Sequence, residues 1–399
     1  MSLSRGTALL TVGVIASIAA CAAAEAPADE ETAGAGDSTD TVEQADPAGT
    51  DGSAEPDASS DDDAAGAGTG YSVANALAHL PRTDTQGAVT IQTAHLELAS
   101  EAAGLDRPAA PDGVAEWLAP VVGQSSAGDP APVFVPLAGL FNAPRLGDHD
   151  EFAEELGWSL ADVDWFVEQA TPPHTYTVVG GDFDASSLAP HLIDVGNAVH
   201  SAGEGEDHAV DIAGATVARP TGVPLRLAVS DGRIAAGPAT VVIGRWAAGA
   251  MDTYADHAEL TAVAAALDDA NVVSAMLVTG ATLSLSELPV PGDTSQLQSL
   301  LPAGPFETVG IGWSAADDAG TITVAYHFPS ADDATAALPA FESVLSEGTL
   351  LSGTPVSRLL GLEDAASDGP VVTLTLSTPT HPALITDLLV SRDVPFLHQ

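Results

Sequence analysis

The chain has 399 residues, and 56 acidic residues against 10 basic ones give it a formal net charge of −46. Every basic residue is an arginine, which excludes a Schiff-base lysine and a lysine-bearing phosphate loop. Nucleic-acid binding is excluded too, because neutralising phosphates requires clusters of Lys and Arg. Electrostatic docking on anionic lipid is disfavoured for the same reason.

Residues 1–20 have the order of a secretory signal peptide. One positive charge, Arg5, precedes an uncharged, mostly apolar stretch from residue 7 to residue 18. This stretch is shorter than the roughly 20 residues that a membrane-spanning helix needs. Two small residues, Ala19 and Ala20, follow it and lead to Cys21. The segment therefore predicts export from the cytoplasm.

The sequence Ile18-Ala19-Ala20-Cys21 resembles the lipobox of bacterial lipoprotein signal peptides. The resemblance implies that diacylglycerol is attached to the Cys21 sulfur, that cleavage occurs before Cys21, and that the protein is lipid-anchored to the outer face of the cytoplasmic membrane. Cys21 is the only cysteine of the chain, so it has no disulfide partner. Two or three acyl chains on one residue would also give stable anchoring. The alternatives are an ordinary cleaved signal and a retained signal anchor.

Residues 21–70, from the expected lipidated Cys21 onward, predict a disordered acidic tether. The segment is rich in Ala, Asp, Glu, Gly, Ser, Thr and Pro, and Val42 is its only branched aliphatic residue. Such a chain buries too little apolar surface to offset the entropy of ordering. A flexible coil of this length has an end-to-end distance of roughly 40 Å. Asp61–Asp63 is interpreted as a solvated charge run rather than a calcium site, because no EF-hand spacing is present.

The remaining residues alternate between short strand patterns and amphipathic helix patterns. The strand patterns are predicted at 87–93, 133–135, 175–179, 210–218, 225–230, 234–236, 239–244, 272–285, 308–314, 321–328 and 371–377. The helix patterns are predicted at 95–104, 150–156, 159–170, 185–200, 257–268, 331–346 and 382–390.

Together these elements predict an α+β fold with mostly antiparallel sheets and helices packed on one face. The length suits two similar subdomains, which we place at 71–236 and 237–399. Asp231-Gly232 predicts a tight hairpin, and Ser159 and Ser330 predict helix caps. The likeness of residues 157–162 to residues 312–317 is interpreted as coincidence, since one segment is predicted to cap a helix and the other to end a strand.

The exported domain resembles uncharacterised lipoproteins of high-GC Gram-positive bacteria. The phrases that carry the resemblance are Gly181-Asp182-Phe183-Asp184 and Arg392-Asp393-Val394-Pro395-Phe396-Leu397. The resemblance implies no particular activity.

The usual signatures of catalysis are missing from the sequence, which contains no Gly-x-Ser-x-Gly, no His-Glu-x-x-His and no Gly-x-Gly-x-x-Gly after a strand. We therefore predict no catalytic residue, no cofactor and no metal. The densest patches of His and carboxylates are Asp148-His149-Asp150-Glu151 and Glu204, Glu206, Asp207 and His208, and chance explains them in so acidic a chain. Trp158 and Trp165 are predicted to pack in the core, with carbohydrate stacking as the alternative.

These observations predict a non-enzymatic binding or envelope-associated lipoprotein whose one predicted partner is the membrane, through its lipid. One alternative is a solute-binding lipoprotein that delivers a small ligand to a transporter, and another is a hydrolase without a recognised motif. A pocket with convergent polar groups between the halves would favour solute binding. Strongly shifted carboxylates in a cleft would favour a hydrolase.

Replacing Cys21 by Ser tests the lipid anchor. We expect the Cys21→Ser protein to incorporate no labelled fatty acid, because the thioether needs a thiol, and to accumulate as precursor or be released. Metabolic labelling and membrane fractionation measure this, with Ser17→Ala in the same leader as the control. A Cys21→Ser protein that still partitions fully with membranes would show the anchor interpretation to be wrong.

Overall fold

The computed structural model describes residues 71–399 except 83–86, 125–129, 142, 172–173, 282, 289–293 and 317–318. The predicted signal peptide, its lipobox with Cys21, and the predicted tether lie outside the described residues. The strands are β1 (Val89–His95), β2 (Trp165–Thr171), β3 (His174–Gly180), β4 (Ile193–Gly196), β5 (Val199–Ala202), β6 (Leu225–Ser230), β7 (Arg233–Gly237), β8 (Ser274–Thr279), β9 (Thr308–Ala316), β10 (Ala319–His327), β11 (Gly361–Asp368) and β12 (Val371–Ser377). The helices are α1 (Val73–Leu77), α2 (Leu96–Ala102), α3 (Val114–Leu118), α4 (His149–Leu156), α5 (Thr240–Ala247), α6 (Ala258–Asp269), α7 (Ser295–Leu300), α8 (Ala331–Glu347) and α9 (Leu384–Val390).

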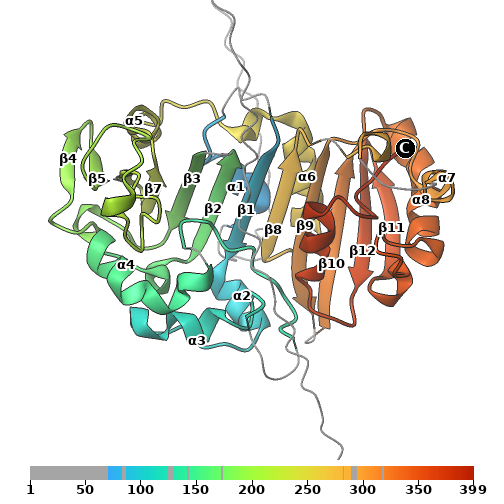
Figure 1. The fold of residues 1–399 in the computed structure, drawn as a ribbon, viewed down its shortest axis with the longest axis horizontal. Helices are drawn as coiled ribbons and strands as arrows, with labels where there is room; N and C mark the ends of the chain where they lie inside the picture. Colours follow the sequence, from blue (N-terminus) through green and yellow to red (C-terminus); the bar gives the residue numbers. More distant parts are fainter. Residues whose placement is uncertain are drawn as a thin grey trace, which may run out of the picture. The chain divides into compact units, whose positions relative to one another are not determined.

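The described strands form one 12-stranded sheet in the order β11-β12-β10-β9-β8-β1-β2-β3-β7-β6-β5-β4 (Figure 1). Neighbouring strands run antiparallel throughout the sheet. The prediction of an α+β fold with mostly antiparallel strands is therefore confirmed.

The strand order repeats on the two sides of the β1–β8 pair. On one side the order is β1-β2-β3-β7-β6, and on the other it is β8-β9-β10-β12-β11. A helix precedes each first strand, α1 before β1 and α6 before β8. The boundary that we predicted after residue 236 falls at the end of β7, and residues of both predicted subdomains share the sheet.

Helices cover both faces of the sheet, so the prediction of helices on one face is wrong. Apolar residues of α1, α5 and α6 pack in one core, whereas those of α2, α3, α4, α8 and α9 pack in the other. The side chains of β8 alternate between the two, with Ala275 and Leu277 in the first and Met276 and Val278 in the second. A central strand buried on both faces needs a covering layer on each.

The segment after Ser159 is a strand rather than the predicted helix. Ser159 and Asp162 do form a capping box, but it closes only a 3₁₀ turn, Leu160–Asp162, before β2 begins at Trp165. Leu160 and Val163 are buried, and so are Phe166 and Val167, which point to opposite faces of the sheet. Burial on both faces of a strand thus produced an apolar pattern that also fits helical spacing.

Four further elements differ from their predicted form, and the first of them, the strand expected at 133–135, is a loop. The expected helix at 185–200 is a short turn followed by the β4–β5 hairpin, in which Asn197 and Ala198 adopt positive φ. The expected strand at 239–244 is helix α5, and that at 210–218 is a loop with one 3₁₀ turn. In contrast, the Asp231-Gly232 hairpin is confirmed, with φ of 50° and 73° at its two turn residues. Ser330 caps α8 as predicted, through a hydrogen bond from the Asp333 backbone N–H.

Two glycines of β9 allow helix α6 to lie close against the sheet. A Cβ atom at Gly310 would lie 2.5 Å from a methyl of Val263, and one at Gly312 would lie 2.5 Å from a methyl of Val272. Both contacts are shorter than van der Waals packing permits. The absence of a side chain at these positions therefore sets the distance between α6 and β9.

Adding one methyl group at Gly312 tests this packing. We expect Gly312→Ala to lower the free energy of unfolding by about 1–3 kcal/mol, because overpacking displaces α6 or Val272. Gly147→Ala is the matched control, since its Cβ would meet no atom within 4 Å. Chemical denaturation measures both variants, and equal stabilities would contradict the proposed close packing.

Candidate functional site

A cleft of about 370 Å³ lies on the α1 side of the sheet, where β1 ends and β2 and β7 begin. Its floor follows one cross-strand row. His95 pairs with Trp165, Trp165 with Gly180, and Gly180 with Arg233. Because directly paired residues project from the same face, the strand register places the side chains of His95, Trp165 and Arg233 beside one another.

Helix α1 forms the wall of the cleft and is held in place at its N-terminus. The Asp268 carboxylate of α6 accepts hydrogen bonds from the backbone N–H groups of Val73 and Ala74, at 2.6 and 3.0 Å. Ser72 caps the helix by accepting a hydrogen bond from the Asn75 N–H. Burial raises the pKa of Asp268, and these N–H groups act in the opposite direction by stabilising the carboxylate. The wall therefore depends on a residue of the second half of the chain.

Trp165 is fixed between two neighbours. Its indole lies against Gly180, where a Cβ atom would come within 2.1 Å of the indole nitrogen. The His79 ring lies 5.2 Å from it at an interplanar angle of 30°. The His79 ring therefore covers one face of the Trp165 indole, and that face is not available to stack on a sugar. The structure thus gives no support to carbohydrate stacking on that face of Trp165. Trp158 packs in the core, as predicted, and is 2% exposed.

The histidines of the cleft are held in their neutral forms. Burial, with a smaller contribution from the Arg233 charge, lowers the pKa of His79 to about 4. Its Nε2 atom has no hydrogen-bond partner among the described residues. Burial also lowers the pKa of His95, whose Nδ1 accepts the Leu98 N–H at 3.2 Å. At neutral pH the cleft thus contains uncharged imidazoles beside a permanent cation.

Tyr71 supplies a further polar group. Its hydroxyl lies 3.1 Å from the Thr93 Oγ1, and that oxygen donates its own proton to the Phe166 carbonyl at 2.7 Å. Tyr71 must therefore be the donor to Thr93, which leaves the lone pairs of its oxygen free to accept a hydrogen bond from a ligand. Burial raises the pKa of Tyr71, so the hydroxyl keeps its proton.

The charges in the cleft are arranged asymmetrically. The described residues form three ion pairs, Arg107–Asp164, Arg219–Glu155 and Arg226–Asp207, at nitrogen–oxygen distances of 2.7–2.8 Å. Asp164 is thus neutralised, whereas Arg233 and Glu97 line the same cleft without an ion-pair partner among the described residues. The cleft consequently offers a cation and an anion at separate positions.

The two predicted patches of His and carboxylates do not form metal sites in the structure. No group of three or more His, Cys, Asp or Glu side chains with metal-binding geometry occurs among the described residues. His149 is buried beside Phe141 and Phe152, and burial lowers its pKa to about 4. Asp207 binds Arg226 and Thr240, while the exposed His208 contacts the ring of His174.

Sequence reasoning did not find the cleft. Its residues come from four separate segments, 71–79, 95–97, 164–165 and 233, which are brought together by strand pairing and by the hydrogen bonds of Asp268 to α1. The one local sequence feature near the cleft that we predicted was the Asp231-Gly232 hairpin, and Arg233 follows it directly.

Comparison with protein-family models, with curated proteins and with solved structures finds no match to the chain. In the part of the chain that the structure describes, no helix is both long and apolar enough to cross a membrane.

The pKa of His79 can be measured directly. We expect a value of about 4 by NMR titration. Arg233→Gln should raise it, because a neighbouring cation disfavours imidazolium, yet burial should keep it below the ordinary 6.5. Arg245→Gln, on the exposed face of α5, is the control that removes the same charge and should leave the titration unchanged. An ordinary pKa for His79 in the unsubstituted protein would contradict the packing described for the cleft.

Proposed function

We propose that the chain is an extracytoplasmic lipoprotein that binds a small polar ligand in the α1 cleft and does not catalyse a reaction. The observation that carries the proposal is the position of Arg233, an arginine without an ion-pair partner among the described residues, in the same cleft as the unpaired Glu97. In a chain with a net charge of −46, carboxylates able to pair with arginine are abundant.

The chemistry of the cleft favours a zwitterion. The guanidinium of Arg233 suits a carboxylate, which it can bind through two parallel hydrogen bonds. Glu97 suits an ammonium group, and His79 Nε2 and the Tyr71 oxygen add uncharged hydrogen-bonding positions. A volume of about 370 Å³ is at the small end of the range for ligand pockets. Amino acids and short peptides carry both a carboxylate and an ammonium group.

Binding is supported over catalysis by the state of the same side chains. A general base works best with a pKa near the working pH, whereas burial holds the pKa of His79 at about 4. His95 uses its Nδ1 to accept a backbone N–H, and Asp164 is paired with Arg107. His79 is thus not tuned to act as a general base at neutral pH, and His95 and Asp164 are engaged by other groups of the protein.

The alternative of solute delivery to a transporter would use the same cleft. Solute receptors with two lobes close by a hinge, which is hard to reconcile with a sheet that continues through the β1–β8 ladder. A binding module that presents its cleft on a rigid sheet fits this continuity better. Lipid attachment at Cys21 would hold the module at the membrane surface, in agreement with the sequence prediction.

A thermal-shift assay of the purified protein with amino acids, dipeptides, dicarboxylates, diamines and sugars tests the proposal. We expect a zwitterionic probe to raise the melting temperature, because a ligand of the folded state stabilises it. Arg233→Gln should remove the shift, whereas Arg245→Gln, with the same change of charge, should retain it. The proposal fails if no probe shifts the transition, or if both variants respond alike.

A further inference from the structure

Exposed apolar side chains are concentrated at one end of the sheet. Among the described residues, seven large apolar side chains are strongly exposed, and four of them fall between residues 193 and 212. Ile193 and Val195 belong to β4 and are 40% and 38% exposed, while Val210 and Ile212 are 66% and 68% exposed. Since solvent exposure of a group of branched side chains is unfavourable, this end of the sheet is a candidate interaction surface.

The backbone at the same place is available for pairing. Among the described strands, β4 is the last of the sheet and pairs only with β5, so no described strand lies along its outer edge. All four of its residues are exposed. Unpaired N–H and C=O groups along such an edge can accept an additional strand from another chain.

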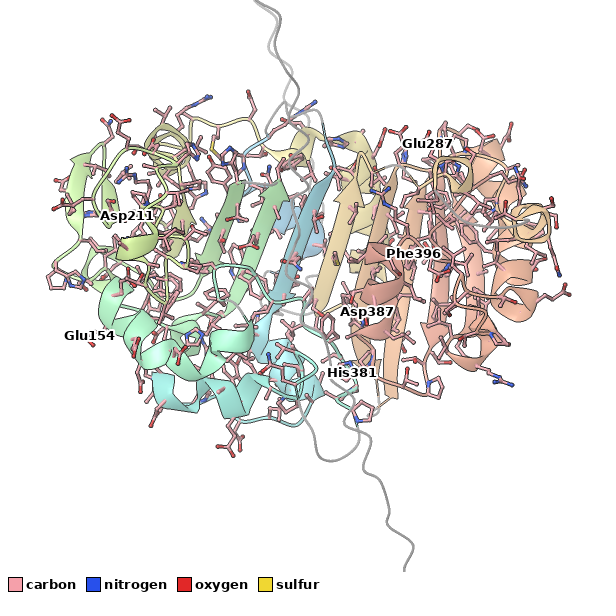
Figure 2. All side chains as sticks on the ribbon, viewed as in Figure 1. Glu154, Asp211, Glu287, His381, Asp387 and Phe396 are labelled. Carbon is pink, nitrogen blue, oxygen red and sulfur yellow. The ribbon has the colours of Figure 1, made fainter. Side chains whose placement is uncertain are left out.

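A cleft of about 680 Å³ lies beside this strand, between α4 and the β4–β5 hairpin. Ile193 lines it, together with the exposed carboxylates Glu151 and Glu154 of α4. Neither carboxylate has an ion-pair partner among the described residues, whereas Glu155 is paired with Arg219. Figure 2 shows Glu154 and Asp211 at the β4 end of the sheet. The surface therefore combines a free strand edge, apolar side chains and unpaired negative charge.

The opposite edge of the sheet is built differently. β11 carries Glu363, Asp364 and Asp368, and α8 packs against it. Charged residues on an edge strand and a covering helix are both devices that prevent pairing with another chain. β4 is short and carries Asp194, but β5 is the only described element that makes extensive contact with it, so β4 is the less covered of the two edges.

From this combination we infer that the β4 edge and the adjoining cleft form a docking surface for an extended, basic and β-branched segment of another protein. The segment adds a strand to β4, its apolar side chains cover Ile193 and Val195, and its basic side chains reach Glu151 and Glu154. A second copy of the chain does not fit this role, because its charge of −46 would be repelled. The inference is independent of the ligand proposed for the α1 cleft.

Binding of a fluorescein-labelled heptapeptide of alternating Arg and Val, followed by fluorescence anisotropy, tests the inference. We expect saturable binding to the purified protein. Glu151→Gln combined with Glu154→Gln should weaken it by about fivefold at low salt. Glu363→Gln combined with Asp364→Asn changes the net charge equally at the other edge, and should alter binding by less than about twofold.

Two controls separate strand pairing from charge attraction. A peptide of the same sequence with N-methyl groups on every internal residue keeps its charge but lacks backbone donors on both edges, and should bind at least about tenfold more weakly. Ile193→Gln should also weaken binding without changing the charge. Equal affinity of the methylated peptide, equal loss in both double variants, or no binding at all would overturn the inference.

Discussion

The β1–β8 ladder is the interaction on which the rest of the described structure depends. Six residue pairs, from Val89–Thr279 to Ala94–Ser274, join two groups of strands that have the same internal order. Each pair contributes to one continuous hydrogen-bonded sheet, so the halves cannot separate without breaking a central ladder. Because this ladder is far from both edges, its side chains are buried on both faces, and a layer of helices is required on each.

The α1 cleft follows from the same constraint. Its floor exists because β1, β2, β3 and β7 are held in a register that aligns His95, Trp165, Gly180 and Arg233. A slip of one residue in any of these strands would send a side chain to the opposite face. The wall depends on Asp268, which binds the N-terminus of α1 from the other half of the chain. The candidate site therefore draws on both halves although its lining comes from one.

Local signals in the sequence were sufficient for some elements. Asp231-Gly232 can adopt the positive φ angles of a tight hairpin, and Ser330 supplies the cap that begins α8, so both predictions are confirmed. The segment after Ser159 was wrongly predicted as a helix for two reasons. A capping box can close a single turn, and a strand buried on both faces lacks the alternation of apolar and polar residues that indicates a strand. β11 was missed because its Ala and acidic residues have low strand propensity and are paired only on one side.

The α1 cleft could not be predicted from local sequence patterns for a different reason. Arg233 and Glu97 are unremarkable in the sequence, and their importance arises only from pairings between distant segments. The continuous apolar run Ala275–Val278 in β8 is typical of a central strand and was the available sign that helices cover both faces. The strand order thus determines both the helix layers on the two faces and the position of the cleft. Residue propensities for helix or strand do not specify that order.

Native-state hydrogen exchange of the purified protein tests most directly whether one sheet unites the chain. We expect the amides of β1 and β8 to be among the most protected, and to exchange with the same free energy of opening as the central strands β2 and β9 on either side. That result would establish a single cooperative unit as the scaffold of the cleft. Exchange of the two strand groups in separate steps, with early opening of β1 and β8, would contradict the account.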